Sequence, residues 1–168
     1  MPKGYTPIGT FEITSGALIV SDPCYKLPVS SYQGELENVK KGTWNASVKT
    51  KDGRCAELLA TYSEAPKRLL RWKMAPFVVG VDSGQAGIFD KTVYDNEETV
   101  TEEPKFTVSY PDYKWYCMCC DRTLYTDIKA GVVPGGVVSQ SGYGDGGYEC
   151  FINRNYKDEI IAVKIVFI

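Results

Sequence analysis

The fold is decided by the last ten residues of the chain, Glu159-Ile160-Ile161-Ala162-Val163-Lys164-Ile165-Val166-Phe167-Ile168. Apolar side chains recur there at every second position, at Ile161, Val163, Ile165 and Phe167, while Lys164 interrupts the opposite face. Successive side chains of a strand point to opposite faces, so this pattern predicts a strand over residues 159–168 with one face on the core. Such an apolar strand belongs inside a sheet rather than at its edge.

Residues that favour strands also dominate the rest of the chain. Val, Ile, Thr and Tyr outnumber Leu and Ala, and 16 Gly with 9 Pro supply frequent turns. Further strands are predicted at residues 11–21, 43–50, 54–62, 77–82, 86–90, 136–140 and 148–153. Lys51-Asp52-Gly53 predicts a hairpin turn, because Asp-Gly readily takes positive φ angles. Residues 153–158 join the last two strands in the same way.

One helix is predicted, over residues 111–124. Pro111 suits the first turn of a helix and Asp112 favours its dipole, and Trp115, Cys119 and Arg122 follow at helical spacing. Together the elements predict a mainly β fold, a β-rich α+β arrangement. Its antiparallel sheets form a sandwich or a partly open barrel, in a single domain over residues 1–168.

The composition excludes several classes of function. The 168 residues contain no histidine, which removes Ser-His-Asp, Cys-His and histidine-ligated metal mechanisms. A net charge of -2 argues against a dedicated nucleic-acid binder. The apolar runs are of strand length and no signal peptide is evident, so we expect a cytoplasmic protein with free thiols and no membrane contact. The sequence indicates no cofactor.

The densest motif runs from Ser139 to Tyr148 and contains four glycines. It satisfies the G-x-G-x-x-G pattern, but a strand follows where a dinucleotide fold needs a helix, and the chain ends too soon for a protein kinase. One interpretation is a hairpin whose turns need glycine, with Asp145 capping backbone amides. The other is that bare backbone lets a ligand approach. Its binding residues would then be Ser141, Gly142, Tyr143, Gly144 and Asp145.

Four aspartates stand at strand ends or beside glycine turns: Asp22, Asp82, Asp90 and Asp145. If they converge, they form a carboxylate cluster for Mg²⁺, Ca²⁺ or general acid-base catalysis. The alternative is that they cap turns and strand ends. Asp82 and Ser83, next to Gly84, are also candidate ligand-binding residues.

Two further segments each have a structural and a functional interpretation. Cys117-Met118-Cys119-Cys120 contains a C-x-x-C, but it has no second pair to complete a zinc site, so buried thiols on a helix are favoured. The segment 67–73 holds four cations and Trp72. Arg68, Arg71 and Trp72 are suited to hold a phosphate and stack a base, and the alternative is an ordinary amphipathic surface.

The order of these motifs resembles a known family. Ser21-Asp22-Pro23, Val81-Asp82-Ser83-Gly84, the block from Ser141 to Tyr148 and the closing Ile-x-Phe strand are similar to the bacterial and phage domain-of-unknown-function family 4241. The resemblance spans residues 16–168, and its most specific part is the glycine-aspartate-glycine block. It implies a β-rich fold and a bacterial or phage origin, and it supplies no mechanism.

The sequence favours a non-catalytic binding module, because its 12 Tyr and its Trp residues give recognition area at low entropy cost. We expect a phage counter-defence protein that sequesters a nucleotide-type signal or blocks a host protein. A homo-oligomer is an open option. A carboxylate-dependent hydrolase, with or without a divalent metal, is one alternative, and it needs two of the four aspartates together in a cleft. An immunity or interaction protein with a flat apolar patch and no pocket is the other.

Overall fold

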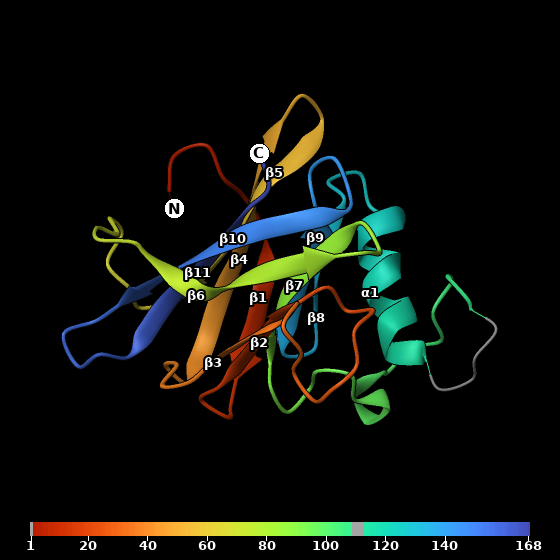
Figure 1. Ribbon diagram of the computed structural model, residues 1–168, viewed down its shortest axis with the longest axis horizontal. Helices are drawn as coiled ribbons and strands as arrows, with labels where there is room; N and C mark the ends of the chain where they lie inside the picture. The colour runs from red at the N-terminus through yellow and green to blue at the C-terminus, as the bar shows by residue number, and fades with distance from the viewer. Residues whose placement is uncertain (1, 109–112) are drawn as a thin grey trace.

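Two antiparallel sheets form the β structure of the computed structural model, which describes residues 2–108 and 113–168 (Figure 1). The larger sheet has the order β1-β4-β5-β11-β10-β6, and the smaller has the order β3-β2-β7-β9-β8. The strands of the larger sheet are β1 (Thr6–Ile13), β4 (Gly42–Lys51), β5 (Arg54–Tyr62), β6 (Lys73–Val81), β10 (Gly146–Arg154) and β11 (Ile160–Val166). Those of the smaller sheet are β2 (Leu18–Ser21), β3 (Gly34–Leu36), β7 (Gln85–Asp90), β8 (Ala130–Val133) and β9 (Gly136–Gln140).

The main core lies between the two sheets, and a second apolar cluster lies beyond the smaller one. Trp44 of β4, Leu58 of β5 and Val163 of β11 pack in the main core against residues of β2 and β7. On the other face of the smaller sheet, Phe89 packs against Trp115 of the helix α1 (Lys114–Leu124). Because β2 and β7 are covered on both sides, every residue in them is buried. The predicted β-rich sandwich is confirmed, and the sheets do not close into a barrel.

The closing strand has the predicted position. β11 lies between β5 and β10, inside the larger sheet. A bulge at Ile161 interrupts its pairing with β10, so Ile160 joins the core cluster and Ile161 is buried outside it. Phe167 lies beyond the strand, and its backbone N–H donates to the carbonyl of Ala56 at 2.8 Å.

Several predicted boundaries differ from the observed ones. The strand expected over residues 11–21 is two strands, β1 and β2, because residues 14–17 turn and Gly16 has a φ of +77°. β6 begins at Lys73 and includes Pro76, which the sheet tolerates since β6 is an edge strand with irregular pairing there. The short strands β3 and β8 were not predicted. The Asp52-Gly53 hairpin turn is confirmed, with both φ angles positive.

The predicted helix is confirmed as α1. Pro111 and Asp112, expected in its first turn, lie outside the described residues. A short 3-10 turn, η1 (Glu97–Thr99), interrupts the acidic segment that precedes the helix. Within the described ranges, no helix is both long and apolar enough to cross a bilayer.

The six cysteines are free thiols, and the three on α1 are buried. Burial raises the pKa of the Cys119 thiol well above its ordinary value, and burial also raises the pKa of Cys117 and Cys120. These side chains are therefore protonated thiols rather than reactive thiolates. This agrees with the structural interpretation of the Cys117-Met118-Cys119-Cys120 segment.

Candidate functional site

Three of the sequence motifs meet at one corner of the molecule, which we call the motif corner: Asp22, residues 82–84, and the loop 141–148. Asp22 is 0 % exposed, and its carboxylate connects the turn that follows it to residues 82–84. Its Oδ2 accepts hydrogen bonds from the backbone N–H of Asp82 (2.9 Å) and Ser83 (2.7 Å). Its Oδ1 accepts from the N–H of Cys24 (2.9 Å) and the hydroxyl of Ser83 (2.6 Å). With four donors on one carboxylate, Asp22 acts as a cap that ties two turns together.

The glycine loop completes the motif corner and is held by bonds within itself. The N–H of Ser141 donates to the carbonyl of Gly84 at 3.1 Å, which joins the loop to the β6–β7 turn. The Tyr148 hydroxyl donates to the carbonyls of Ser141 (3.1 Å) and Gly144 (2.6 Å). Gly142 and Gly144 have φ angles of +59° and +114°, so the turn itself requires glycine there.

The exposed side chains of the motif corner are Tyr143, Asp145 and Asp82. Tyr143 lies under the Arg54 guanidinium, whose carbon is 4.6 Å from the ring centroid. Asp82 accepts a hydrogen bond from the Tyr25 hydroxyl at 2.5 Å. Burial, followed by that bond, raises the pKa of Tyr25, so the phenol stays protonated. The pockets of about 450, 420 and 330 Å³ are lined by other residues.

Asp90 lies apart from the other three candidate carboxylates. Pairing of β2 with β7 sets Asp90 opposite Leu18 and Gly87 opposite Ser21, so Asp22 and Asp90 sit at opposite ends of β2. Its carboxylate accepts hydrogen bonds from Ser15, Thr14 and Thr92. Burial raises the pKa of Asp90, but those hydrogen bonds outweigh burial, and the net pKa is lowered.

The structure therefore does not bring the four aspartates together. Asp22 lies beside Asp82, and both Asp22 and Asp90 are already saturated with donors. In the described part of the chain, no group of three or more Cys, Asp or Glu side chains is placed to hold a metal ion. The capping interpretation of Asp22 and Asp90 is the one that fits these contacts.

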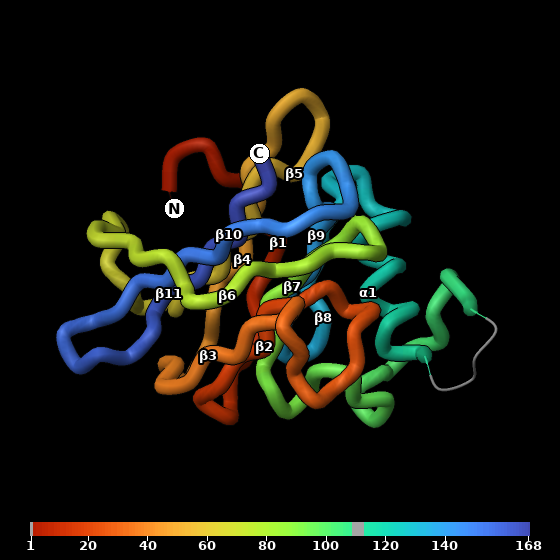
Figure 2. The backbone as a smooth tube through the Cα atoms, in the orientation of Figure 1, coloured from red at the N-terminus to blue at the C-terminus, as the bar shows by residue number. Residues whose placement is uncertain are grey.

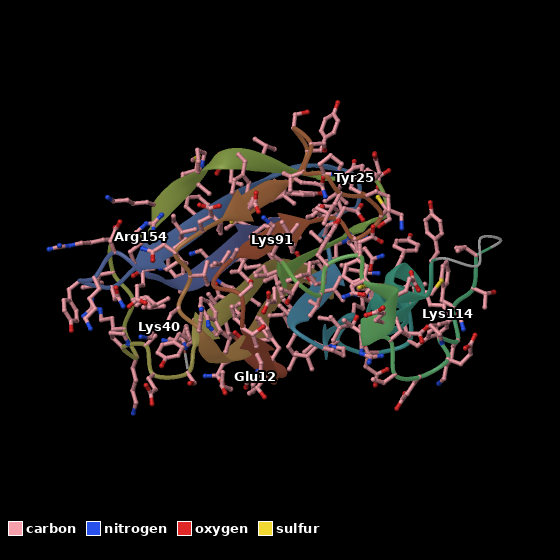
Figure 3. All side chains as sticks on the ribbon, turned by 90° about the horizontal axis from the view of Figure 1, so that it is seen from below. Glu12, Tyr25, Lys40, Lys91, Lys114 and Arg154 are labelled. Carbon is pink, nitrogen blue, oxygen red and sulfur yellow. The ribbon has the colours of Figure 1, made fainter. Side chains whose placement is uncertain are left out.

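The basic segment lies at the other end of the molecule. Residues 63–72 connect β5 to β6 on the side away from α1 (Figure 2). Asn153 anchors this loop, since its Nδ2 donates to the carbonyl of Leu70 at 2.6 Å. Figure 3 shows the neighbouring Arg154 at the end opposite Tyr25, whose hydroxyl contacts Asp82 of the motif corner. A small ligand bound at the basic segment would therefore not reach the motif corner.

Beneath this loop is a pocket of about 330 Å³, which we call the basic pocket. It lies on the outer face of the larger sheet, the face turned away from the main core, where Leu59 of β5 stands opposite Lys164 of β11. Its charged and aromatic lining consists of Lys3, Tyr5, Lys67, Arg68, Trp72 and Lys164. The volume falls within the range of small-molecule sites.

Among the described residues, no carboxylate forms an ion pair with the four cations of the basic pocket. The ion pairs among the described residues involve none of Lys3, Lys67, Arg68 and Lys164. The Lys164 Nζ instead lies 4.6 Å from the centroid of the Trp72 ring and 5.7 Å from that of Phe151. Lys164 is half-buried as a residue, and its ammonium lies against these aromatic faces rather than against any carboxylate that the structure describes.

The carboxylate of Glu57 lies close to the basic pocket, and an ion pair with a lysine outside the pocket offsets its charge. Glu57 of β5 accepts a hydrogen bond from the Tyr5 hydroxyl and pairs with the Lys49 Nζ at 3.5 Å. Burial first, and then Glu57, raises the pKa of Tyr5, which therefore remains a neutral phenol in the pocket wall. The local charge of the pocket is thus positive, and its chemistry suits an anion with an aromatic part.

The structure divides the predicted ligand-binding residues between the two ends. Arg68 and Trp72 line the basic pocket, whereas Arg71, with a φ of +64°, is exposed and does not line it. Ser141, Gly142, Tyr143, Gly144, Asp145, Asp82 and Ser83 belong to the motif corner. Sequence reasoning missed Lys3, Tyr5 and Lys164 as pocket residues. Of these only Lys164 carried a signal, as the cation that interrupts an apolar strand.

A family model described as a protein of unknown function (DUF4241) matches residues 11–165, nearly the whole chain. The family resemblance inferred from the motifs is thereby confirmed. Comparison with curated proteins and with solved structures found no match.

Proposed function

The chain belongs to the DUF4241 family of proteins of unknown function, and from its geometry we propose that it is a non-catalytic binding module for an anionic, nucleotide-type ligand. The ligand binds in the basic pocket, with its phosphate at the cations and its planar part at Trp72 or Tyr5. Phosphate is the anion that Lys and Arg side chains bind most commonly in such sites, and aromatic faces stack bases without sequence preference.

The observation that supports this proposal best is the environment of Lys164. Its ammonium lies against two aromatic rings and is paired with no carboxylate of the described residues, and contact with an aromatic face contributes only about 0.5–2 kcal/mol. A phosphate oxygen in the basic pocket would supply the missing counter-charge. The three other unpaired cations, Lys3, Lys67 and Arg68, line the same pocket and would share the charge of a polyphosphate.

The biological role follows from binding without turnover. A cytoplasmic protein that holds a signalling nucleotide lowers its free concentration, which is the phage counter-defence role expected from the sequence. In the other form of this role, the cationic surface binds and blocks a host protein instead of a nucleotide. The hydrolase alternative has no comparable support, since Asp22 and Asp90 are committed to caps.

Isothermal titration with ribonucleoside 5′-triphosphates tests the proposal. We expect at least one triphosphate to bind, and both Lys164→Gln and Arg68→Gln to weaken its binding by about tenfold or more, the cost of one charge-assisted hydrogen bond. Higher salt should weaken binding further, because the pocket is open to solvent.

Lys51→Gln is the matched control. Lys51 is exposed on the β4–β5 hairpin and does not line the basic pocket, so this variant makes the same change in net charge and should bind as the wild type does. Melting temperatures would show that each variant is folded. Absence of binding by the folded wild-type protein, or an equal loss in all three variants, would contradict the proposal.

A further inference from the structure

A second pocket adjoins the basic pocket on the same outer face. It has a volume of about 450 Å³, and we call it the polar pocket after the polar side chains of its floor; its walls also include Pro2, Pro7, Ala65, Pro66 and Leu69. Pro2, Lys67 and Leu69 line both pockets, so the two are adjacent and share part of their wall. The proposed function uses only the basic pocket and leaves the polar pocket without a role.

The floor of the polar pocket is a row of side chains from three neighbouring strands. Thr10 of β1 stands opposite Asn45 of β4, and Asn45 stands opposite Thr61 of β5. Alternation along β4 explains why they point outward: Trp44 and Ala46 enter the core, so Asn45 and Ser47 face away from it. Directly opposed side chains on one sheet face lie about 5 Å apart at Cβ, so the row is a contiguous polar surface.

These side chains are not engaged by the rest of the protein. Across the described residues, no hydrogen bond is made by the side-chain polar atoms of Thr10, Asn45, Ser47, Thr61 or Ser63, all of which line the polar pocket. Thr10, Asn45 and Ser63 are exposed and Thr61 is half-buried, so their hydroxyl and amide groups are available to hydrogen-bond a ligand that displaces water from them. Ser47 is 5 % exposed as a residue, and its hydroxyl at the pocket floor, which makes no hydrogen bond among the described residues, is also available.

The two pockets differ in charge. The polar pocket shares Lys67 with the basic pocket and is otherwise lined by uncharged residues, whereas the basic pocket contributes Lys3, Arg68 and Lys164 as well. A ligand that spans both must therefore be anionic at one end and uncharged, with hydrogen-bonding groups, at the other.

We infer that the two pockets form one bipartite site for a phosphate ester of a sugar, with the phosphate in the basic pocket, the sugar in the polar pocket, and any attached base at Trp72 or Tyr5 as in the proposed function. This inference rests on the proposed function, because it takes the basic pocket as the phosphate site. Nucleotides and simple sugar phosphates share this chemistry. The Asn45 amide and the neighbouring hydroxyls recognise the uncharged part of the ligand through hydrogen bonds.

The test compares esters that carry the same phosphate group. Methyl phosphate, ribose 5-phosphate and the four ribonucleoside 5′-monophosphates are titrated into the wild type, Asn45→Ala and Thr61→Val. We expect ribose 5-phosphate or a nucleotide to bind about tenfold or more tightly than methyl phosphate, since each added hydrogen bond contributes up to about tenfold. Each variant should reduce that advantage by about three- to tenfold and leave methyl phosphate binding unchanged.

Thr43→Val is the control variant for the polar pocket. Thr43 lies on the same face of β4, two residues before Asn45, but its hydroxyl donates to Glu12 and it does not line the pocket. We expect it to bind every ester as the wild type does.

Each outcome separates the inference from the proposed function. If ribose 5-phosphate binds more tightly than methyl phosphate and nucleotides bind no more tightly still, the site recognises the sugar. If nucleotides bind more tightly than ribose 5-phosphate, the site recognises the base as well. Equal affinity for all esters, with no effect of Asn45→Ala or Thr61→Val, would overturn the bipartite site. The proposed function of the basic pocket would still hold in that case if Lys164→Gln weakens triphosphate binding. If neither esters nor triphosphates bind, the proposed function fails and the inference fails with it.

Discussion

Replacing Asp22 by alanine tests whether the motif corner is a structural cap. The carboxylate is 0 % exposed, and its loss leaves the backbone N–H groups of Cys24, Asp82 and Ser83 without their acceptor. Each buried donor left unpaired costs about 1–3 kcal/mol. Cys24 and Ser83 are half-buried and Asp82 is exposed, so water can partly replace the lost acceptor, the three losses will not add fully, and we expect about 3–5 kcal/mol in total. For a domain of this size that corresponds to a fall in melting temperature of roughly 6–20 °C.

Asp82→Ala is the matched control. It removes the same type of residue from the turn that Asp22 caps. Asp82 is exposed, and among the described residues its carboxylate accepts a hydrogen bond only from the Tyr25 hydroxyl, so we expect a change within about 0.5 kcal/mol. Urea denaturation of the three proteins gives the two differences. A stable Asp22→Ala variant, or equal losses in both, would refute the capping interpretation.

Three further predictions concern pH, the closing strand and a bound ligand. The lowered pKa of Asp90 stabilises the folded state above the ordinary Asp pKa of 3.8, and that contribution is lost as pH falls through the lower folded pKa. The wild type should therefore be more stable than Asp90→Asn at neutral pH, and urea denaturation between about pH 6 and pH 2 should show the gap narrowing; a constant gap would contradict this. Deleting residues 166–168 removes Phe167 from the core and should abolish soluble expression, whereas normal yield and melting temperature would refute the role of the closing strand. Native mass spectrometry of freshly purified, untagged protein should show a small-molecule mass that disappears on denaturation and should also report the oligomeric state; a bare mass would argue against sequestration.

The sequence predicted the elements whose pattern is local. β5 and β9 have the predicted bounds, because turn residues flank each of these short runs of apolar and strand-favouring residues. β3 and β8 were missed, since three or four residues carry too little periodicity to be recognised. β2 and β7 are buried on both faces, and a continuous apolar run of this kind does not say what covers it.

The candidate site was only half predictable, because its residues come from distant parts of the chain. Arg68 and Trp72 were named from a basic segment that contains an aromatic residue. Lys164 joins them through the pairing of β11 with β5, which a single sequence does not reveal. Lys3 and Tyr5 reach the basic pocket from the segment before β1, and no pattern in that segment indicated it. The glycine loop drew attention for its density, yet positive φ angles at Gly142, Gly144 and Gly146 account for three of its glycines.

The central claim, that an anion binds in the basic pocket, is tested most directly by the indole N–H signals of the 3 Trp residues. Trp44 and Trp115 are 0 % exposed in the two apolar clusters, whereas Trp72 lines the basic pocket beneath Lys164. In ¹⁵N-labelled protein titrated with ATP, with Trp72→Phe used for assignment, we predict that the Trp72 signal shifts and that the other two stay in place. A titration that leaves the Trp72 signal unmoved while the backbone amides of Gly142 and Gly144 shift would contradict the account and place the ligand at the motif corner.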